Sequence, residues 1–388
     1  MHIAQMLDTL DWGGAQMMQL FLVETLQPLG IEMTVISLMQ SSDSPFEKKL
    51  REAGVDIVFF PFHQLFSPGS FIKLVNYLRQ EKFDLIHAYL TYSNIVGPLA
   101  GRLTGTPTIA SLRSSDFENK SYTVKRAFLE TFTMRFLATR VMANGLAVEK
   151  YARHRLKDSR NVYTIPNAVD FARAIPDDER QQIRSEITGD LTRPLVLTVG
   201  RLSAAKGFHD LIKAFAFVHT QVPAAVLVIA GGGFLFDELK SHIEKLGLEE
   251  QIILLGARAD VPHLLAAADI YVNSSHREGT PVSVLEAMAA GLPVVATRVG
   301  ENPYLLDPDA GLLVAPHQPQ ALAAAIISLL NSEELRKKLG NSARERIQRS
   351  YSRETWRKSL LTLYSEITPE AKPYLELVIQ NSILTEAV

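Results

Sequence analysis

The sequence of 388 residues contains no cysteine, which excludes disulfide bonds and thiolate metal sites. It has no run of about 18 uncharged apolar residues, so we expect no membrane-spanning helix. The opening residues, MHIAQMLDTLDWGGAQ, lack a basic segment followed by an apolar one, and we therefore expect no signal peptide and a cytoplasmic protein. The net charge of −2 gives no general attraction to nucleic acid, so we expect no nucleic-acid partner.

Several signatures of known chemistry are also missing. The dinucleotide fingerprint GxGxxG with a following acidic residue is absent, although glycine runs occur at 13–14 and 231–233. The loops discussed below contain no HExxH, GxSxG, Walker A or DxD pattern. We therefore predict no cofactor and no metal site, and protein cations have to neutralise any bound diphosphate.

Short apolar runs alternate with amphipathic segments along the whole chain. We predict strands at residues 2–6, 33–38, 56–60, 85–88, 108–111, 140–143, 195–199, 225–230, 252–255, 270–273 and 293–296. Helical patterns between them include residues 15–29, 69–81, 207–219, 236–246, 261–267, 281–290 and 319–330. Apolar strands that alternate with helices are typical of parallel sheets covered on both faces. The predicted fold class is therefore α/β, with two Rossmann-like domains.

A polar, proline-containing stretch between Asn167 and Arg193 marks the domain boundary and predicts a linker followed by a short surface helix. We assign residues 1–170 to the first domain and residues 171–365 to the second. The tail, residues 366–388, follows an amphipathic helical pattern that ends near Ile367.

Residues 276–297, HREGTPVSVLEAMAAGLPVVAT, contain the signals for a complete buried helix. Thr280 is a suitable N-cap, and Pro281 suits the first helical position. Gly291 is a suitable residue to end the helix. The helix is apolar except at Glu286, and a buried carboxylate is costly unless it has partners.

Two interpretations of Glu286 stay open. It pairs with a nearby arginine or backbone amide, or it accepts hydrogen bonds from ligand hydroxyls such as those of a ribose. Glu278 lies eight residues earlier in a strand-to-helix loop, where ligands of α/β proteins bind. The first N–H groups of the helix lie between the two carboxylates and form an anion site. A sugar, a diphosphate and a nucleoside fit this order.

The segment LVLTVGRLSAAKG, residues 195–207, places Arg201 and Lys206 directly after a buried strand. Arginine binds a diphosphate through two parallel hydrogen bonds, and lysine binds it as a point charge. The alternative is a pair of solvent-exposed loop residues.

Further candidates follow strands of the first half. Gly13 and Gly14, in DWGGAQ, allow close backbone approach to a ligand or simply form a tight turn. We assign four residues to a pocket for the acceptor or the donor sugar: His87, Arg113, Asp116 and Lys120. A structural role is the alternative for His87.

Residues 120–160 contain ten Lys and Arg against three Asp and Glu. Phe128, Phe132 and Phe136 interleave with these basic residues at helical spacing. The pattern fits an interfacial helix on an anionic membrane surface. A solvated helical face or a helix that faces the core fits it as well.

The chain resembles the retaining glycosyltransferases of family four, also called group 1, which have the GT-B fold with two Rossmann-like domains facing across a deep cleft. The resemblance is carried by Glu278-x7-Glu286 within GTPVSVLEAMAAGLPVVAT and by VGRLSAAKG. The segment TIPNAVD (164–170) and the closing YSRETWRKSLLTLYSEI (351–367) are also similar to the family. The resemblance implies that the first domain binds the acceptor and that the second binds the nucleotide sugar. It also implies that the tail, residues 366–388, crosses back to the first domain.

The resemblance also implies a role for each candidate residue. Glu286 holds the ribose hydroxyls, and Glu278 contacts hydroxyls of the donor sugar. Arg201 and Lys206 bind the diphosphate and stabilise the leaving nucleotide. The remaining donor contacts are expected at Gly13, Gly14, Thr280, Pro281, Val282 and Ser283 and, near the base, at Gly256 and Arg258.

The chain departs from the family pattern at two places. Arg113 stands where many members have a histidine, and we hypothesise that it pairs with the carboxylate of a hexuronic-acid donor or with an acceptor phosphate. Tyr304, in VGENPYLL, stands where the family usually has a glutamate, and Glu301 is a candidate replacement.

The predicted function is metal-independent, retaining transfer of a hexose-type sugar from a nucleotide-diphosphate donor, UDP rather than GDP, to an acceptor hydroxyl. The acceptor is a sugar or lipid-linked sugar in cell-surface polysaccharide or glycolipid synthesis. The donor's own β-phosphate takes the acceptor proton, while the protein contributes positioning and electrostatics. The alternatives are a nucleotide-sugar 2-epimerase on the same fold and an inactive GT-B binding scaffold. We expect a cytoplasmic enzyme, peripheral on the inner face of the membrane.

Overall fold

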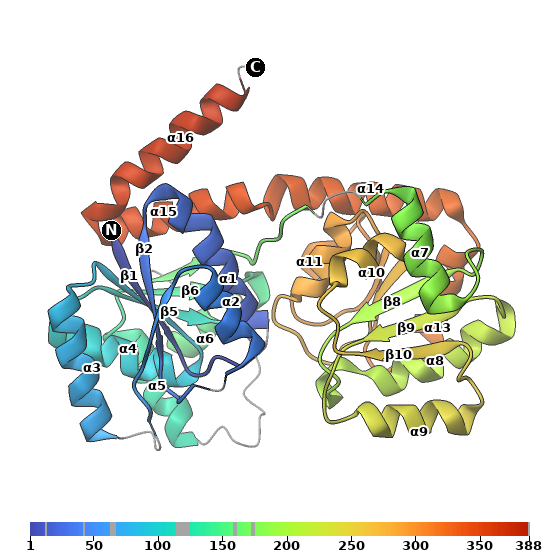
Figure 1. Ribbon diagram of the computed structural model, residues 1–388, viewed down its shortest axis with the longest axis horizontal. Coiled ribbons are helices and arrows are strands. Elements are labelled where there is room, and N and C mark those ends of the chain that lie inside the picture. The colour runs from blue at the N-terminus through green and yellow to red at the C-terminus, as the bar shows by residue number, and fades with distance from the viewer. Residues whose placement is uncertain are drawn as a thin grey trace. The chain divides into compact units, whose positions relative to one another are not determined.

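The computed structural model describes residues 1–11, 14–41, 43–62, 67–113, 124–157, 161–171 and 175–386. The chain divides into two compact units, which can be followed by colour in Figure 1. Unit 1 comprises Met1–Asn167 and Arg353–Val388, and unit 2 comprises Ala168–Ser352. Within the described ranges, no helix combines the length and hydrophobicity needed to cross a bilayer.

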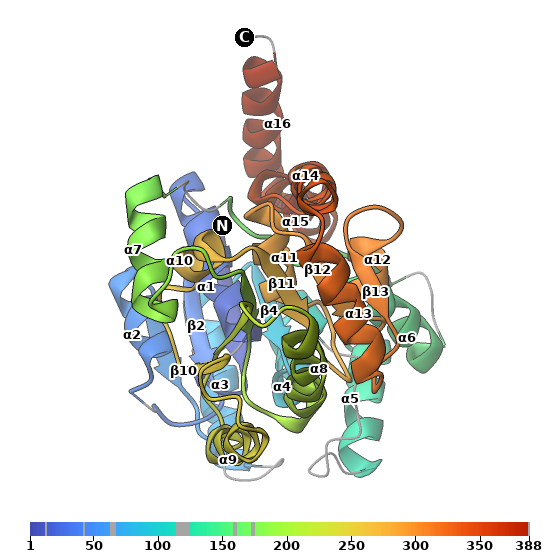
Figure 2. The ribbon, with the colours of Figure 1, turned by 90° about the vertical axis from the view of Figure 1, so that its right-hand side faces the viewer.

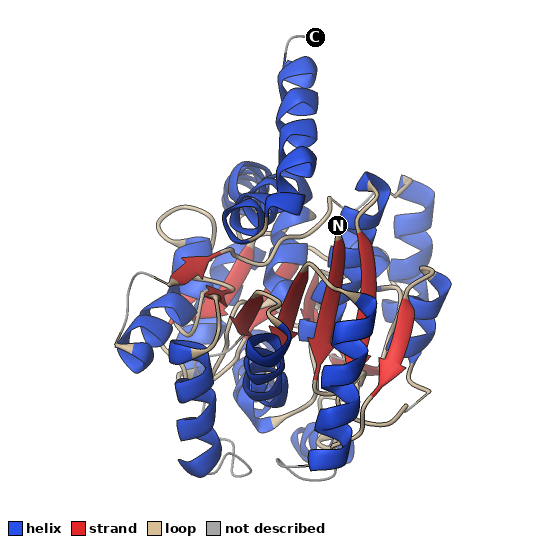
Figure 3. Cartoon of the chain, turned by 90° about the vertical axis from the view of Figure 1, so that its left-hand side faces the viewer, coloured by secondary structure: helices blue, strands red, loops and turns tan. Residues whose placement is uncertain are grey.

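Unit 1 is built on a parallel sheet of seven strands in the order β3-β2-β1-β4-β5-β6-β7. Its strands are β1 (His2–Leu7), β2 (Glu32–Ser37), β3 (Asp56–Phe59), β4 (Leu85–Tyr89), β5 (Thr108–Leu112), β6 (Arg140–Ala143) and β7 (Val162–Thr164). Its helices are α1 (Gly14–Leu26), α2 (Pro45–Glu52), α3 (Pro68–Glu81), α4 (Thr91–Thr104), α5 (Val124–Phe136), α6 (Leu146–Leu156), α15 (Arg353–Ile367) and α16 (Lys372–Glu386). Figure 3 shows these strands in red with helices in blue on both sides.

Unit 2 repeats this architecture with six parallel strands in the order β10-β9-β8-β11-β12-β13. Its strands are β8 (Leu195–Val199), β9 (Val226–Ala230), β10 (Ile252–Gly256), β11 (Ile270–Asn273), β12 (Val294–Thr297) and β13 (Leu312–Val314). Its helices are α7 (Asp177–Thr188), α8 (Phe208–Gln221), α9 (Phe236–Leu246), α10 (Val261–Ala267), α11 (Val282–Ala289), α12 (Asn302–Leu306), α13 (Pro319–Leu330) and α14 (Glu333–Ser350). Helices α8 and α13 lie side by side in Figure 2.

The strands of unit 2 are apolar on both faces because each face carries its own core. Val196 and Leu227 belong to the cluster that includes α8, α9 and α13. Leu197 and Val228, the next residues along the same strands, belong to the cluster that includes α10 and α11. Successive side chains of a strand point to opposite faces, which explains the uninterrupted apolar runs in the sequence.

The predicted strands are confirmed, and no predicted end differs from the observed one by more than one residue. Two further strands, β7 and β13, were not predicted; each has only three residues, too few for a periodic signal. The return of the chain to unit 1 begins at Arg353, whereas the predicted return begins at residue 366.

This earlier return has a simple packing reason. Trp356 of α15 packs edge-on against Phe21 of α1, with ring centroids 5.3 Å apart. The guanidinium of Arg353 lies 4.2 Å from the centre of the same Phe21 ring and forms an ion pair of 3.3 Å with Glu24. These contacts join α15 to unit 1 from its first turn.

The strand order reverses once in each sheet, between β1 and β4 in unit 1 and between β8 and β11 in unit 2. At such a point, the loops that follow the two neighbouring strands run to opposite sides of the sheet and leave a crevice between them. Ligands of open parallel sheets bind there, so these two positions are the first places to look for a site.

Candidate functional site

The reversal point of unit 2 brings two of the predicted motifs together. Strands β8 and β11 pair in parallel, with Val196 opposite Ile270 and Leu197 opposite Tyr271. The loop after β8 carries Arg201 and Lys206, and the loop after β11 carries Glu278. Because both loops leave the same edge of the sheet, residues about 70 positions apart in sequence can act on one ligand.

Lys206 and Glu278 are in direct contact. The Lys206 Nζ lies 2.6 Å from Glu278 Oε1. Asn273 Nδ2, at 3.2 Å, and the Ser275 hydroxyl, at 2.6 Å, also donate to that oxygen. The side chain of Glu278 is only 8% exposed, so it is held in one orientation by three donors. The oxygen Oε2 has no donor among the described residues and can accept from a ligand hydroxyl.

The two loops are also joined through their backbones. The His276 N–H donates to the carbonyl of Ala205 at 2.8 Å, and the Ser274 hydroxyl donates to the carbonyl of Lys206 at 3.0 Å. Gly207 has φ +64°, and a Cβ there would lie 2.1 Å from the Ser274 carbonyl oxygen. Glycine is therefore required at this position for both conformation and space.

Helix α11 begins one residue later than predicted. Thr280 is buried but is not the N-cap, and Pro281 lies before the first helical residue. Pro281 fills the N-cap position in an extended conformation, and its carbonyl accepts from the N–H of Val284 at 3.1 Å. The N–H groups of Val282 and Ser283 precede this first helical bond, as expected of an anion-binding helix start.

The predicted end of α11 is confirmed. Gly291 has φ +76°, and its N–H donates to the carbonyl of Met288 at 3.0 Å. The N–H of Leu292 donates to the carbonyl of Ala287 at 3.0 Å. This pair of bonds is a Schellman motif, which explains why the sequence needs a glycine there.

Glu286 lies in the second turn of α11 and is largely buried. Among the described residues, no side chain or backbone group is hydrogen-bonded or ion-paired to its carboxyl group. Burial alone raises the pKa of this carboxyl to about 7. The interpretation that Glu286 pairs with an arginine or an amide is therefore not supported by the described residues, and the interpretation as an acceptor for ligand hydroxyls remains.

The second departure from the family pattern lies against the Glu278 loop. A Cβ on Gly300 would lie 2.4 Å from the carbonyl oxygen of Glu278, and the N–H of Glu301 donates to the carbonyl of Gly279 at 2.9 Å. The side chain of Glu301 is fully buried, and Tyr304 is partly exposed. The segment therefore supports the loop that carries Glu278 through its backbone.

Other candidates of unit 2 lie at the same sheet edge. Arg201 is exposed directly after β8, and Gly256 ends β10 with φ +70°. Arg258 follows it and forms an ion pair with Asp260, with Nε 2.7 Å from Oδ1. In the glycine run after β9, a Cβ on Gly231 would lie 1.8 Å from the Gly200 carbonyl oxygen. This run therefore serves the close approach of two strand ends.

In unit 1, His87 lies inside β4 and is fully buried. Its Nε2 lies 2.8 Å from the Ser111 hydroxyl, and its Nδ1 lies 2.7 Å from the Tyr364 hydroxyl and 2.9 Å from that of Tyr89. Burial, together with the charge of Arg113, lowers the pKa of His87 well below its usual value. A neutral ring with both nitrogens occupied favours the structural interpretation.

Arg113 belongs to the same cluster. Its Nη1 donates to Asn167 Oδ1 at 2.9 Å, and its guanidinium lies 4.7 Å from the centre of the Tyr89 ring. Its Nε is buried and has no hydrogen-bond partner among the described residues, and burial lowers the pKa of the group. Such an arginine retains the capacity to bind an anionic ligand group.

Three of the candidates, Gly13, Asp116 and Lys120, lie outside the described residues, and Gly14 opens α1. Asp8, which directly follows β1 at the reversal point of unit 1, is not among the predicted residues. Its carboxylate accepts from the N–H groups of Tyr92, at 3.0 Å, and Ser93, at 2.7 Å. Burial raises the pKa of Asp8 to about 6. Its position directly after the first strand is the feature of the sequence that could have predicted it.

Comparisons with known proteins show the family to which the chain belongs. The family Glycosyl transferases group 1 matches residues 179–346, and Glycosyltransferase Family 4 matches residues 12–173. The D-inositol 3-phosphate glycosyltransferase of Corynebacterium glutamicum is 30% identical over 76% of this chain and 75% of that protein. The UDP-Gal:alpha-D-GlcNAc-diphosphoundecaprenol alpha-1,3-galactosyltransferase of Escherichia coli is 29% identical over 61% of this chain. That match covers 63% of the galactosyltransferase.

Among solved structures, HepE of Anabaena in complex with UDP-glucose has a TM-score of 0.81 and 24% identity, with 94% of this chain and 99% of that chain covered. This similarity shows the fold, in which two parallel sheets with flanking helices form a GT-B protein. The family matches cover most of both units, and the reversal point of unit 2 brings Lys206 and Glu278 into contact. The chain belongs to the group 1 glycosyltransferases, glycosyltransferase family 4.

Proposed function

We propose that this protein transfers a sugar from a UDP-sugar to an acceptor hydroxyl with retention of the anomeric configuration and without a metal ion. The observation that carries the proposal is Glu286, a largely buried carboxylate that lacks a partner among the described residues. A group that is costly to bury persists where a ligand completes it. The ribose hydroxyls of a nucleotide are donors of the required kind.

The rest of the donor fits the neighbouring groups in order. The N–H groups of Val282 and Ser283, at the start of α11, are suited to the diphosphate. Arg201 and Lys206 supply its countercharges. Glu278, with one oxygen held by three donors, offers its other oxygen to hydroxyls of the sugar.

The proposed chemistry needs only groups of the protein and the donor. The bond between the anomeric carbon and the β-phosphate oxygen breaks, and the acceptor oxygen bonds to the same face of that carbon. The acceptor proton passes to the departing β-phosphate. Lys206 and Arg201 stabilise the charge that develops on the phosphate, a contribution of about 3–4 kcal/mol for a well-placed group.

Two similarities support the choice of substrates. HepE was solved with UDP-glucose, and the relative from Escherichia coli acts on a diphosphoundecaprenol-linked sugar. We therefore propose a UDP-sugar donor bound by unit 2 and a lipid-linked or free sugar acceptor bound by unit 1. The product then belongs to a cell-surface polysaccharide or glycolipid.

Helix α5 supports contact with an anionic membrane surface. Phe128, Phe132 and Phe136 follow one another at four-residue spacing and are 68%, 44% and 61% exposed. These aromatic residues therefore do not face the core, and Glu130 and Met134 do so instead. Exposed aromatic rings next to basic residues are typical of helices that lie in the membrane interface.

A donor screen tests the proposed reaction. The purified protein is incubated with UDP-glucose, UDP-galactose and UDP-N-acetylglucosamine, with and without lipid-linked sugar acceptors, and the products are analysed by NMR for anomeric configuration. We expect release of UDP that depends on the acceptor and an axial linkage from an axial donor. An inverted linkage would contradict retention, and an epimer formed from the donor alone would favour the 2-epimerase.

The inactive scaffold is tested by calorimetry with UDP, since a scaffold has no need of the acidic and basic pairs. The membrane proposal is tested by sedimentation with vesicles of neutral or anionic lipid. Serine at positions 128, 132 and 136 should release the protein from anionic vesicles. Phe217→Ser and Phe234→Ser are the controls, because these exposed rings lie in unit 2. Equal binding by both sets of variants would contradict a role for α5.

A further inference from the structure

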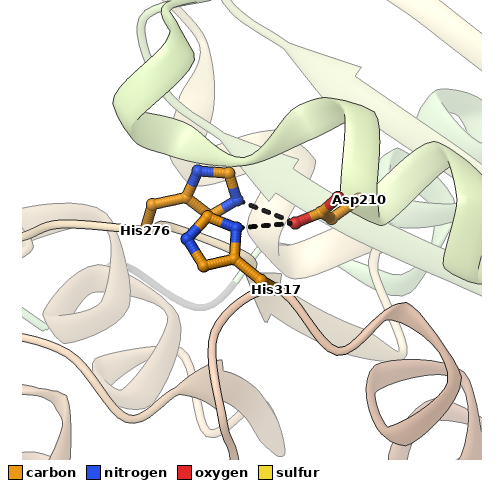
Figure 4. Close-up of side chains that lie close together, drawn as sticks. All are labelled: Asp210, His276 and His317. Atoms are coloured by element: carbon orange, nitrogen blue, oxygen red, sulfur yellow. Dashed lines mark hydrogen bonds and ion pairs between the residues drawn. The ribbon is translucent and has the colours of Figure 1, made fainter.

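A second polar cluster of unit 2 includes His276, which lies in the loop between β11 and α11 that also carries Glu278. His276 Nε2 lies 2.8 Å from Asp210 Oδ2, and His317 Nδ1 lies 3.5 Å from the same oxygen. Figure 4 shows the two imidazole rings pointing a nitrogen at this one carboxylate. The three side chains come from three separate parts of unit 2: the loop after β11, the first turn of α8 and the loop before α13.

The backbone holds these three groups in place. His317 has φ +59°, a left-handed conformation that is uncommon for a residue other than glycine. Its ring lies 3.8 Å from the ring of His276, measured between centroids. His276 is anchored through its own N–H, which donates to the Ala205 carbonyl at 2.8 Å. Two imidazoles are thus brought against one carboxylate by segments fixed elsewhere.

Two imidazole nitrogens and a carboxylate oxygen are ligands of Zn²⁺ and related first-row transition ions, whereas Mg²⁺ and Ca²⁺ prefer oxygen ligands. In a tetrahedral site with bonds of about 2.1 Å, neighbouring ligand atoms lie roughly 3.4 Å apart. The distances of 2.8 and 3.5 Å lie on either side of that value, and all three ligand atoms lie within 4.8 Å of one another.

We propose that Asp210, His276 and His317 form a binding site for a divalent transition-metal ion of the zinc class, with water completing the coordination. His317 is 65% exposed, whereas His276 and Asp210 are 24% and 20% exposed, so an ion can enter from solvent. The site is separate from the chemistry of transfer and does not rest on the proposed function.

The position of the site gives it a mechanical consequence. His276 lies two residues before Glu278, and Asp210 lies four residues after Lys206. An ion that binds both His276 and Asp210 joins the segments that carry the Lys206–Glu278 pair, with His317 as a third anchor. Bound metal therefore stabilises this part of unit 2 against unfolding.

The test uses the full chain, freed of metal with a chelator and with any affinity tag removed. Co²⁺ is titrated and followed by visible absorption, and Zn²⁺ is titrated by calorimetry. We expect one ion per chain, the intense visible bands of a four- or five-coordinate Co²⁺ site, and a higher Tm with Zn²⁺. His317→Ala and Asp210→Asn should each weaken binding by at least about tenfold.

The control variant is His242→Ala. His242 lies in the same unit with its ring 5.4 Å from that of His209, which in turn contacts Glu238 at 3.0 Å, but it is not part of the proposed site. This variant should bind the ion as the wild type does. If wild type binds no ion, or if His317→Ala and Asp210→Asn bind as tightly as His242→Ala, the site does not exist. Both variants alter side chains that are at least partly exposed, so we expect them to fold, and circular dichroism verifies this.

Discussion

The two units have the same parallel architecture, but their polar groups differ in whether they have hydrogen-bond partners within the protein. In unit 1, His87 is hydrogen-bonded at both ring nitrogens, and Asp8 accepts from two backbone N–H groups. In unit 2, Glu286 is largely buried and has no partner among the described residues, and Glu278 has one oxygen without a donor among them. We call the first kind of cluster closed, because its polar atoms are hydrogen-bonded within the protein, and the second kind open, because some of its polar atoms lack a partner. A closed cluster stabilises the fold, whereas an open one is suited to a ligand. Five predictions can break or sharpen this comparison.

The largest expected effect concerns Lys206, which lies at the open cluster. Lys206→Met should lower kcat by about 100- to 1000-fold, because the positive charge that stabilises the negative charge developing on the leaving phosphate is lost. Steady-state kinetics with the best donor measures this. Lys213→Met, an exposed lysine farther along α8, is the control and should be nearly neutral. A change in KM alone would show that Lys206 only binds the donor.

Glu286→Gln removes the charged acceptor and retains the shape of the side chain. Donor affinity should fall by about 10- to 100-fold, because hydrogen bonds to a charged group contribute about 1.5–3 kcal/mol. At a pH above 7, the Tm of the free protein should rise, because the variant lacks a largely buried charge that has no partner among the described residues. Calorimetry with UDP measures the first effect. Glu244→Gln, on the exposed side of α9, is the control, and equal donor affinity in both variants would place the nucleotide elsewhere.

Stability should also depend on pH through Glu286. Its pKa rises from 4.5 to about 7 on folding, so the folded state keeps a proton that the unfolded chain releases. The free energy of unfolding therefore falls as the pH rises from about 4.5 to 7, by about 3 kcal/mol in total. Asp8, with its pKa raised to about 6, contributes a slope of the same sign. The difference between wild type and Glu286→Gln in urea unfolding isolates Glu286, and parallel curves would contradict its burial.

Mutation of His87, in the closed cluster, should lower stability and leave donor binding unchanged, which is the opposite of the effect expected for Glu286. His87→Phe leaves the hydroxyls of Ser111 and Tyr364 without their partner, which costs about 1–3 kcal/mol of unfolding free energy. The affinity for UDP should stay the same. His154→Phe, at an exposed position of α6, is the control for stability. Loss of UDP binding in His87→Phe without loss of stability would make His87 a ligand-binding residue.

The smallest expected effect concerns Arg113, which contacts Tyr89 in the closed cluster and whose buried Nε has no hydrogen-bond partner among the described residues. We predict that Arg113→Ala lowers turnover with a hexuronic-acid donor by about tenfold more than turnover with a hexose donor, because a charged hydrogen bond is lost. Parallel assays with UDP-glucuronic acid and UDP-glucose measure this. An equal loss with both donors would contradict a contact with the donor carboxylate.

Much of the fold could be predicted from the sequence because its signals are local. The apolar runs of β8 and β11, and the glycine that ends α11, depend only on residues a few positions apart. The start of α11 was misplaced by one residue because Thr280 and Pro281 are both acceptable caps, and the packing of the loop decides between them. The strand β13 was missed because three residues give no period.

For the site, the sequence supplied the residue types and the structure supplied their neighbours. Motif spacing, together with the resemblance to the family, predicts Glu278, Glu286, Arg201 and Lys206 as contacts of a nucleotide sugar. It could not show that Lys206 and Glu278 touch, because this contact depends on the strand order that places β8 next to β11. Nor could it show which buried polar group is satisfied.

By itself, the sequence determined that this chain is an α/β protein of two units with an acidic and a basic pair after its strands. Hydrophobic periodicity and glycine conformation act over a few residues, so they can be read in the order of the chain. Only the tertiary structure decided that both ring nitrogens of His87 are hydrogen-bonded and that Glu286 has no partner among the described residues. It also decided that His276 and His317 converge on Asp210. Those outcomes depend on contacts between segments far apart in sequence, which strand order and packing set together.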